Sequence, residues 1–207
     1  MSNISQNRVG ELNYLRFEPA EFSENKKYPI IIHFHGAGSR GDNVDILNNQ
    51  SIVCYAKATE NFPFVMFLPQ CNANTWFDVF GQLREFVKAV MELPYVDKEK
   101  VFLSGVSMGG YAAWQMLMTE NKLFKKAIIC CGGGMYWNAT RIKTAVWAFH
   151  GIDDPVVFFE ESKKMVEAVN RNDGNAKLTA YKGVGHNCWE LTYNNPEIYA
   201  WLLSEEK

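Results

Sequence analysis

A serine flanked by glycines is the first feature of the chain that points to chemistry. Residues 105–109 read Gly-x-Ser-x-Gly with Ser107 at the centre, after the apolar run 101–103 and before a helix-like pattern. A serine in this setting sits on a sharp turn that lifts its hydroxyl above the end of a sheet. The glycines lack Cβ atoms, so strand and helix can approach closely around it. We therefore predict that Ser107 is a nucleophile, which requires a base, an acid and an oxyanion hole elsewhere in the chain.

Two polar loops, each directly after a predicted strand, supply a base and an acid. His186 lies in a polar loop after the last predicted strand and has no packing role in the sequence, so we predict that it takes the proton of the serine hydroxyl. Asp153 and Asp154 follow the preceding strand. Pro155 biases the residue before it to an extended backbone, which favours Asp154 as the acid and leaves Asp153 as its competitor. A serine, an acid and a histidine thus follow one another in that chain order.

Two backbone N–H groups are the predicted oxyanion hole. The N–H of Met108 lies at the start of the helix after Ser107, where the helix dipole also stabilises negative charge. The N–H of Ala37 lies in a glycine-rich loop after the first central strand. The three histidines other than His186 lie within a strand (His33) or before a glycine at a strand end (His35 and His150), and we expect structural roles for them.

The elements that must position these residues alternate along the chain. Short apolar runs with turn residues at their ends predict strands, and apolar residues at helical spacing predict helices. This alternation predicts an α/β fold, a mostly parallel sheet with helices on both faces, formed by a single domain over residues 1–207 without a cap domain. The predicted strands are 28–34, 62–68, 101–103, 127–131, 145–149 and 177–181, with one or two antiparallel strands over 9–17; the predicted helices are 45–59, 78–93, 108–119, 158–172 and 196–204.

Charge and cysteine content argue against several classes of partner. The net charge of −2 gives no electrostatic reason to expect nucleic acid or an anionic membrane as a partner. Residues 1–8 lack the apolar stretch of a signal peptide, and no segment is apolar and long enough to span a bilayer. The five cysteines form no Cys-x-x-Cys pair and no zinc-like spacing. We expect a cytoplasmic protein with free thiols, no metal and no cofactor.

Four aromatic residues in loops are candidates for a substrate pocket. Trp76 and Phe77 follow the second central strand, Trp137 follows a run of three glycines, and Trp189 follows His186 at a distance of three residues. We predict that Trp76 and Phe77 line the acyl or alcohol side of the pocket, that Trp137 belongs to the opposite wall, and that Trp189 lies beside His186. The alternative is that these aromatic side chains only shield the edge of the core.

Several motifs together resemble a known family. They are residues 27–41, residues 69–71 followed by Trp76, and the stretches 105–110, 150–157 and 185–189. In this order they are similar to bacterial esterases of the carboxylesterase or "predicted peptidase" group of the α/β-hydrolase superfamily, near feruloyl and acetyl xylan esterases. The resemblance implies the α/β-hydrolase fold and ester hydrolysis by Ser107, His186 and Asp154, the aspartate before proline being the acid in that family. One departure is Ser39, where relatives often carry a glutamate before the arginine.

The sequence therefore predicts a serine esterase that cleaves a small-molecule carboxylic ester through an acyl-enzyme on Ser107. Two alternatives stay open. One is an acyl-protein thioesterase or lysophospholipase, which needs a long apolar groove. The other is a non-catalytic binding protein with the same fold, against which the complete set of serine, acid and base argues.

Overall fold

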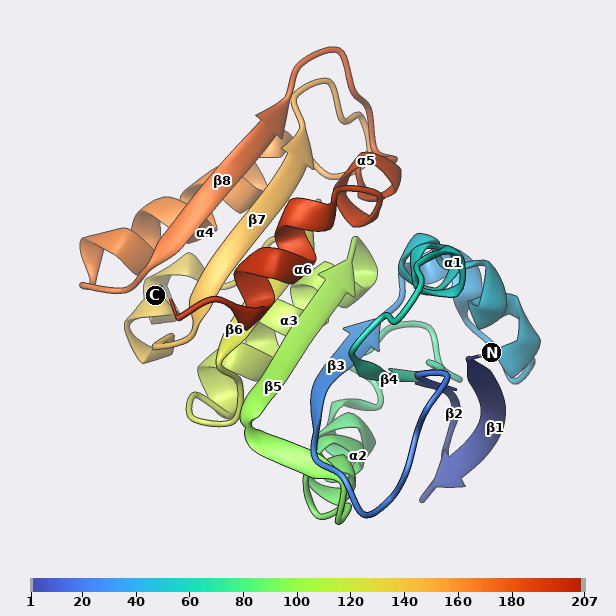
Figure 1. Cartoon of the computed structure of the whole chain (residues 1–207). Helices are drawn as coiled ribbons and strands as arrows, with labels where there is room; N and C mark the ends of the chain where they lie inside the picture. The colour runs from blue at the N-terminus through green and yellow to red at the C-terminus, as the bar shows by residue number, and fades with distance from the viewer. Residues whose placement is uncertain (1, 206–207) are drawn as a thin grey trace.

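An eight-stranded sheet forms the centre of the molecule (Figure 1). The computed structural model describes residues 2–205, and the strand order is β1-β2-β4-β3-β5-β6-β7-β8. The first three strands in this order pair antiparallel, and from β4 to β8 all pairs are parallel. The strands are β1 (Asn3–Val9), β2 (Leu12–Glu18), β3 (Tyr28–Phe34), β4 (Val65–Pro69), β5 (Val96–Val106), β6 (Lys126–Cys130), β7 (Ala145–Gly151) and β8 (Ala176–Tyr181). This is the mostly parallel sheet that the alternating pattern predicted.

Helices cover both faces of the sheet (Figure 1). One face carries α2 (Phe80–Met91), α3 (Met108–Thr119) and α4 (Phe159–Arg171). The other carries α1 (Ser51–Ala58) and α6 (Pro196–Leu203), with α5 (Trp189–Tyr193) beside them. Three short 3-10 helices lie in loops: η1 (Ala37–Ser39), η2 (Val44–Asn49) and η3 (Tyr136–Arg141).

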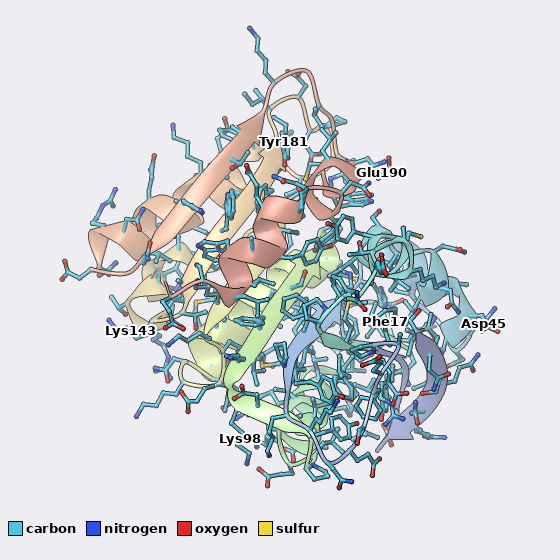
Figure 2. The ribbon with its side chains drawn as sticks, viewed as in Figure 1. Phe17, Asp45, Lys98, Lys143, Tyr181 and Glu190 are labelled. Atoms are coloured by element: carbon cyan, nitrogen blue, oxygen red, sulfur yellow. The ribbon has the colours of Figure 1, made fainter. Side chains whose placement is uncertain are left out.

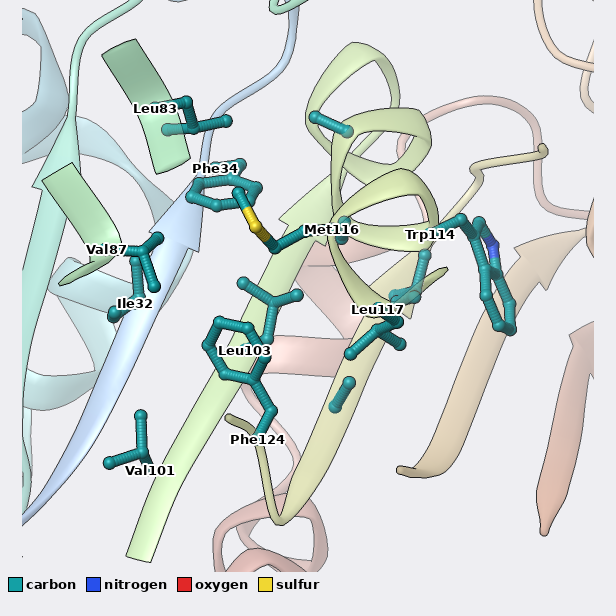
Figure 3. Packing of buried hydrophobic residues seen from close by; sticks show 14 of the residues in the cluster. Ile32, Phe34, Leu83, Val87, Val101, Leu103, Trp114, Met116, Leu117 and Phe124 are labelled. Atoms are coloured by element: carbon teal, nitrogen blue, oxygen red, sulfur yellow. The ribbon is translucent and has the colours of Figure 1, made fainter. Parts of the chain in front are cut away.

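Alternation along the strands divides the core into two layers. In β3, Ile30, Ile32 and Phe34 pack toward α2 and α3, whereas Ile31 packs toward the opposite face. Figure 3 shows the first layer, where Phe34 and Leu103 meet Met116 and Leu83. Because both faces of the central strands are buried, the sheet is rigid, and its loops start from fixed positions.

Several boundaries differ from the sequence prediction. The helix expected over 45–59 is split at Gln50 into η2 and α1. Asp78 does not begin α2: its carboxylate instead accepts hydrogen bonds from the N–H and hydroxyl of Thr75, and the helix begins at Phe80. The prediction also missed α5 and η3, which are too short to show a helical period. None of the helices within residues 2–205 is long and apolar enough to cross a membrane.

A glycine fixes the contact between α3 and the end of β3. A Cβ atom on Gly109 would overlap the carbonyl oxygen of Phe34, and it would lie 2.7 Å from the carbonyl oxygen of His35. Both neighbours are backbone atoms, which cannot turn away as a side chain does. The helix that follows Ser107 therefore sits as close to the glycine-rich loop after β3 as backbones allow.

We expect Gly109→Ala to destabilise the fold by about 3 kcal/mol or more, because the extra methyl must displace backbone. The measurement is urea unfolding at neutral pH. Gly38→Ala is the matched control: no atom lies within 4 Å of its added Cβ, so we expect a change within about 0.5 kcal/mol. Equal stability of the two variants would show that α3 can shift to accept the methyl group.

Candidate active site

Ser107 occupies a strained turn between β5 and α3. Its backbone angles are φ 53° and ψ −117°, a region that residues with a Cβ atom rarely adopt. The hydrogen bond from its N–H to the carbonyl oxygen of Cys130 (2.9 Å) holds this conformation against the end of β6. The strain is offset by the packed strand and helix on either side, and the serine side chain is thereby raised at the carboxyl edge of the sheet.

The structure brings His186 and Asp154 to this serine. His186 Nε2 lies 2.9 Å from Ser107 Oγ, and His186 Nδ1 lies 2.7 Å from Asp154 Oδ2. Asp154 follows β7, and His186 lies in the loop after β8. Figure 2 labels Tyr181 and Glu190, and the loop between these two residues carries His186. The three side chains form one hydrogen-bonded line from carboxylate to hydroxyl, the arrangement by which an imidazole takes a proton from serine.

Asp154 is buried and held as a carboxylate. Burial alone would raise its pKa, but the hydrogen bond with His186 and those from the N–H groups of Val156 and Val157 outweigh burial and lower the pKa. These N–H groups lie 2.8 and 3.0 Å from Oδ1. Asp153, the other candidate for the acid, is exposed, and among the described residues it forms no hydrogen bond with His186.

His150 supports the acid. Its Nε2 lies 3.2 Å from Asp154 Oδ2 and 2.9 Å from the carbonyl oxygen of Val157. Its Nδ1 lies 2.7 Å from Ser162 Oγ on α4. The ring is fully buried, so it holds the Asp154 loop in place, the structural role expected for it.

The glycine-rich loop after β3 lies beside Ser107. A Cβ atom added to Gly36 would lie 3.5 Å from the Cβ of Ser107, so the two residues are direct neighbours. His35 holds this loop: its Nε2 accepts the N–H of Cys71 (2.9 Å), which places the proton on Nδ1, where it donates to the carbonyl oxygen of Gly36 (2.6 Å). Burial lowers the pKa of His35 to about 4, so the ring is neutral at pH 7.

Arg40 and Gln70 complete the support of the loop. Arg40 Nε donates to the carbonyl oxygen of Ala37 (2.9 Å), and its Nη1 donates to Asn74 (2.7 Å). Gln70 Nε2 donates to the carbonyl oxygen of Ser39 (3.0 Å). Backbone carbonyl groups thus hold the Arg40 side chain in this protein, whereas a glutamate at position 39 would hold it by an ion pair. Within residues 2–205, the N–H groups of Ala37 and Met108 donate to no other protein group, so both are free to bind an anion.

A hollow of about 370 Å³ opens beside Ser107 and His186. Its walls are the loop 36–39, the side chains of Gln50, Val106 and Val156, and the indole of Trp189. The Trp189 ring stands edge-on to His186, with the ring centroids 5.3 Å apart. A hollow of this size suits a small ligand.

The structure does not place the other three predicted pocket residues, Trp76, Phe77 and Trp137, at the hollow beside Ser107. Trp76 does not line the hollow beside Ser107: its side chain is fully buried against Phe34 and His35, and its Nε1 donates to the carbonyl oxygen of His35 (3.0 Å). Phe77 lines a separate apolar hollow of about 570 Å³ between α2 and α3. Trp137 lies on η3 with 70% of its surface exposed and does not contact the hollow beside Ser107. Trp189 alone of the four lies next to His186.

Thiols lie behind the site. The Sγ of Cys131 lies within 4.8 Å of the ligand atoms of Asp154 and His186. The neighbouring Cys188 and burial both raise the pKa of Cys131, so it is a neutral thiol at pH 7. Asp154 and His186 already bond to each other here, and Cys131 packs beneath them.

The sheet has the topology of the α/β-hydrolase fold, and the hydrogen-bonded line Ser107–His186–Asp154 lies at its carboxyl edge. A family model described as "Dienelactone hydrolase family" matches residues 67–194. The chain belongs to this dienelactone hydrolase family.

Relatives and solved structures agree with this placement. The chain is 26% identical over 182 residues to "Probable feruloyl esterase C" of Aspergillus niger. The match covers 84% of this chain and 67% of that protein. A solved structure described as a thermostable esterase is 29% identical with a TM-score of 0.84, covering 97% of this chain and 62% of that one. Est1E from Butyrivibrio proteoclasticus is 14% identical and shares the fold with a TM-score of 0.74, covering 96% of this chain and 97% of Est1E. The chain thus spans about two thirds of the Aspergillus protein and of the thermostable esterase.

Proposed function

We propose that the protein is a serine hydrolase that cleaves small-molecule carboxylic esters. The observation that carries the proposal is the continuous hydrogen-bonded line from Asp154 through His186 to Ser107 Oγ, with distances of 2.7 and 2.9 Å. The similarity to proteins named as esterases supports an ester as the substrate.

Each residue has a defined part in the reaction. Ser107 Oγ attacks the ester carbonyl carbon while His186 Nε2 takes its proton. The N–H groups of Ala37 and Met108 bind the oxyanion, and one such donor is typically worth about 3 kcal/mol of the barrier. His186 then gives the proton to the leaving alcohol. Asp154 keeps the imidazole in the tautomer with its proton on Nδ1 and stabilises the imidazolium that forms.

The second half of the reaction repeats these steps with water. His186 takes a proton from a water molecule, which attacks the acyl-enzyme carbonyl. The collapse of the second tetrahedral intermediate releases the carboxylic acid and returns the proton to Ser107. We propose that the chain carries out both halves as one domain without a cap and needs no metal or cofactor.

We further propose a cytoplasmic location. The five cysteines are free thiols, and Cys130, Cys131 and Cys188 lie close together without forming a disulfide. Free thiols in such proximity suit a reducing compartment.

A fluorophosphonate probe tests the proposal, because it reacts only with an activated serine. We expect the wild-type protein to be labelled at Ser107, as read by mass spectrometry of the modified peptide, and Ser107→Ala to show no labelling. A folded wild type that stays unlabelled would instead indicate a binding protein. Short-chain and long-chain acyl esters and thioesters, compared as substrates of the unlabelled wild-type enzyme, separate an esterase from a thioesterase.

A further inference from the structure

Two polar side chains outside the proton-transfer line border the hollow beside Ser107. Most of its wall is backbone or apolar side chain, from Val106, Val156 and Trp189. Ser39 and Gln50 line the same hollow and bring a hydroxyl and an amide. Neither is part of the proton-transfer line.

Gln50 is held in a fixed position. Its Nε2 donates to Ser39 Oγ (2.9 Å), and Ser39 is itself fixed through its carbonyl oxygen by Gln70. The Gln50 carbonyl oxygen accepts the N–H groups of Val53 and Cys54 at the start of α1. The Gln50 side chain also hydrogen-bonds to the ring of His33, and the residue is partly exposed. The second N–H of this positioned amide is thus available to a ligand.

The ring of the buried His33 holds Gln50 from the other side. His33 Nδ1 lies 3.1 Å from Ser104 Oγ, which lies 2.6 Å from the hydroxyl of Tyr193. The Gln50 side chain hydrogen-bonds to the same ring and also lines the hollow, so it joins this buried polar chain to the hollow. A hydroxyl group bound at Gln50 would extend the chain.

We propose that Gln50, positioned by Ser39 and backed by His33, is a specificity-determining residue that binds a hydroxyl group of the ester. This inference rests on the proposed function and narrows its substrates to small hydroxylated esters. A hydroxyl can accept from the second Nε2 proton of Gln50 and can donate to the second lone pair of its Oε1, the first being used by His33. A site built to bond a hydroxyl discriminates against the analogue that lacks it, because its own polar groups are then left unpaired.

Matched ester pairs test the proposal and locate the hydroxyl. One pair, 2-hydroxyethyl acetate and ethyl acetate, differs on the alcohol side; the other, ethyl 3-hydroxybutyrate and ethyl butyrate, differs on the acyl side. The readout is the ratio of kcat/KM for the hydroxylated ester to that for its analogue. We expect Gln50→Leu to lower this ratio about tenfold for one of the pairs, the loss of one to two hydrogen bonds. Comparing enzyme variants cancels the intrinsic reactivity of each ester.

Two further variants keep the result interpretable. Ser39→Ala releases the Gln50 amide, and we expect a smaller fall of the same ratio, about threefold. Gln115→Leu is the matched control: Gln115 lines the separate hollow near Phe77 and bonds to Thr119, so the ratio should stay at its wild-type value. Fluorophosphonate labelling of Ser107 in every variant reports a folded, activated site.

The outcomes separate the inference from the proposed function. If all variants are labelled and neither Gln50→Leu nor Ser39→Ala changes either ratio by more than twofold, the hydroxyl specificity is wrong while the esterase proposal stands. If Gln50→Leu cannot be obtained folded, the Ser39→Ala ratio decides. If the wild type is not labelled, the proposed function itself fails.

Discussion

Asp154→Asn is expected to lower kcat by about 10⁴-fold with little change in KM. In the wild-type protein, the Asp154 carboxylate accepts a hydrogen bond from the N–H at Nδ1 of His186, 2.7 Å away. An amide NH₂ in its place donates to Nδ1 instead, which puts the imidazole proton on Nε2, facing Ser107. The ring then cannot take the serine proton, although every atom stays near its present position. The ester substrate still binds in the same hollow, so the loss falls on kcat.

Steady-state hydrolysis of a simple acetate ester measures this effect, with Asp153→Asn as the matched control. Asp153 is the adjacent, exposed carboxylate, and the same substitution there should leave kcat within about twofold. Thermal unfolding of both variants checks that the Asp154 loop is intact. If Asp154→Asn keeps more than a tenth of the wild-type kcat, or if Asp153→Asn loses most of it, the assignment of Asp154 as the acid is wrong.

Between pH 7 and pH 5 the free energy of unfolding is expected to fall by about 4 kcal/mol, because two buried histidines resist protonation. Burial lowers the pKa of His33 to about 3 and that of His35 to about 4. In the unfolded chain both rings take up a proton near pH 6.5, so the unfolded state binds more protons below that pH. Their stabilising effect is therefore complete above pH 6.5 and is lost as the pH falls toward the folded pKa values. Each ring contributes about half of the loss.

Urea unfolding at a series of pH values measures this dependence. In His35→Gln the loss between pH 7 and pH 5 should shrink to about 2 kcal/mol, whatever the stability of the variant at pH 7. Between pH 7 and pH 8 both rings are neutral in both states, so they should add no slope there. A free energy of unfolding that is flat from pH 7 to pH 5 would mean that the rings take up protons in the folded state.

Local patterns predicted the parallel sheet and the residues that the structure brings together at its carboxyl edge. Ser107, Asp154 and His186 each follow a short apolar strand, and the end of a parallel strand fixes where the next residues lie. The predicted and observed bounds of α3 are the same, since the serine turn begins it and the apolar pattern ends at Thr119. These features depend on neighbours in the sequence, so the sequence is sufficient to predict them.

Roles that depend on distant partners were not predictable in the same way. Trp76 looked like a pocket residue because it lies in a loop, but its indole finds a backbone acceptor at His35 and becomes part of the core. The predicted helix begins at Asp78, yet the Asp78 carboxylate bonds to Thr75 and α2 begins at Phe80. Gln50 carried no signal in the sequence, because its meaning comes from Ser39 and from His33 on another element. Only the folded arrangement brings these residues together.

The edge position of β8 bears on how the protein is made. The strand pairs only with β7 within the sheet, and the loop after it carries His186, 79 residues after Ser107. During synthesis the nucleophile turn, the acid and the base therefore leave the ribosome in that order, and the base arrives last. Under the proposed function, the hydroxyl of Ser107 would therefore gain its base only after β8 has docked. Partly folded chains that lack a docked β8 would lack the paired imidazole that makes the serine a nucleophile.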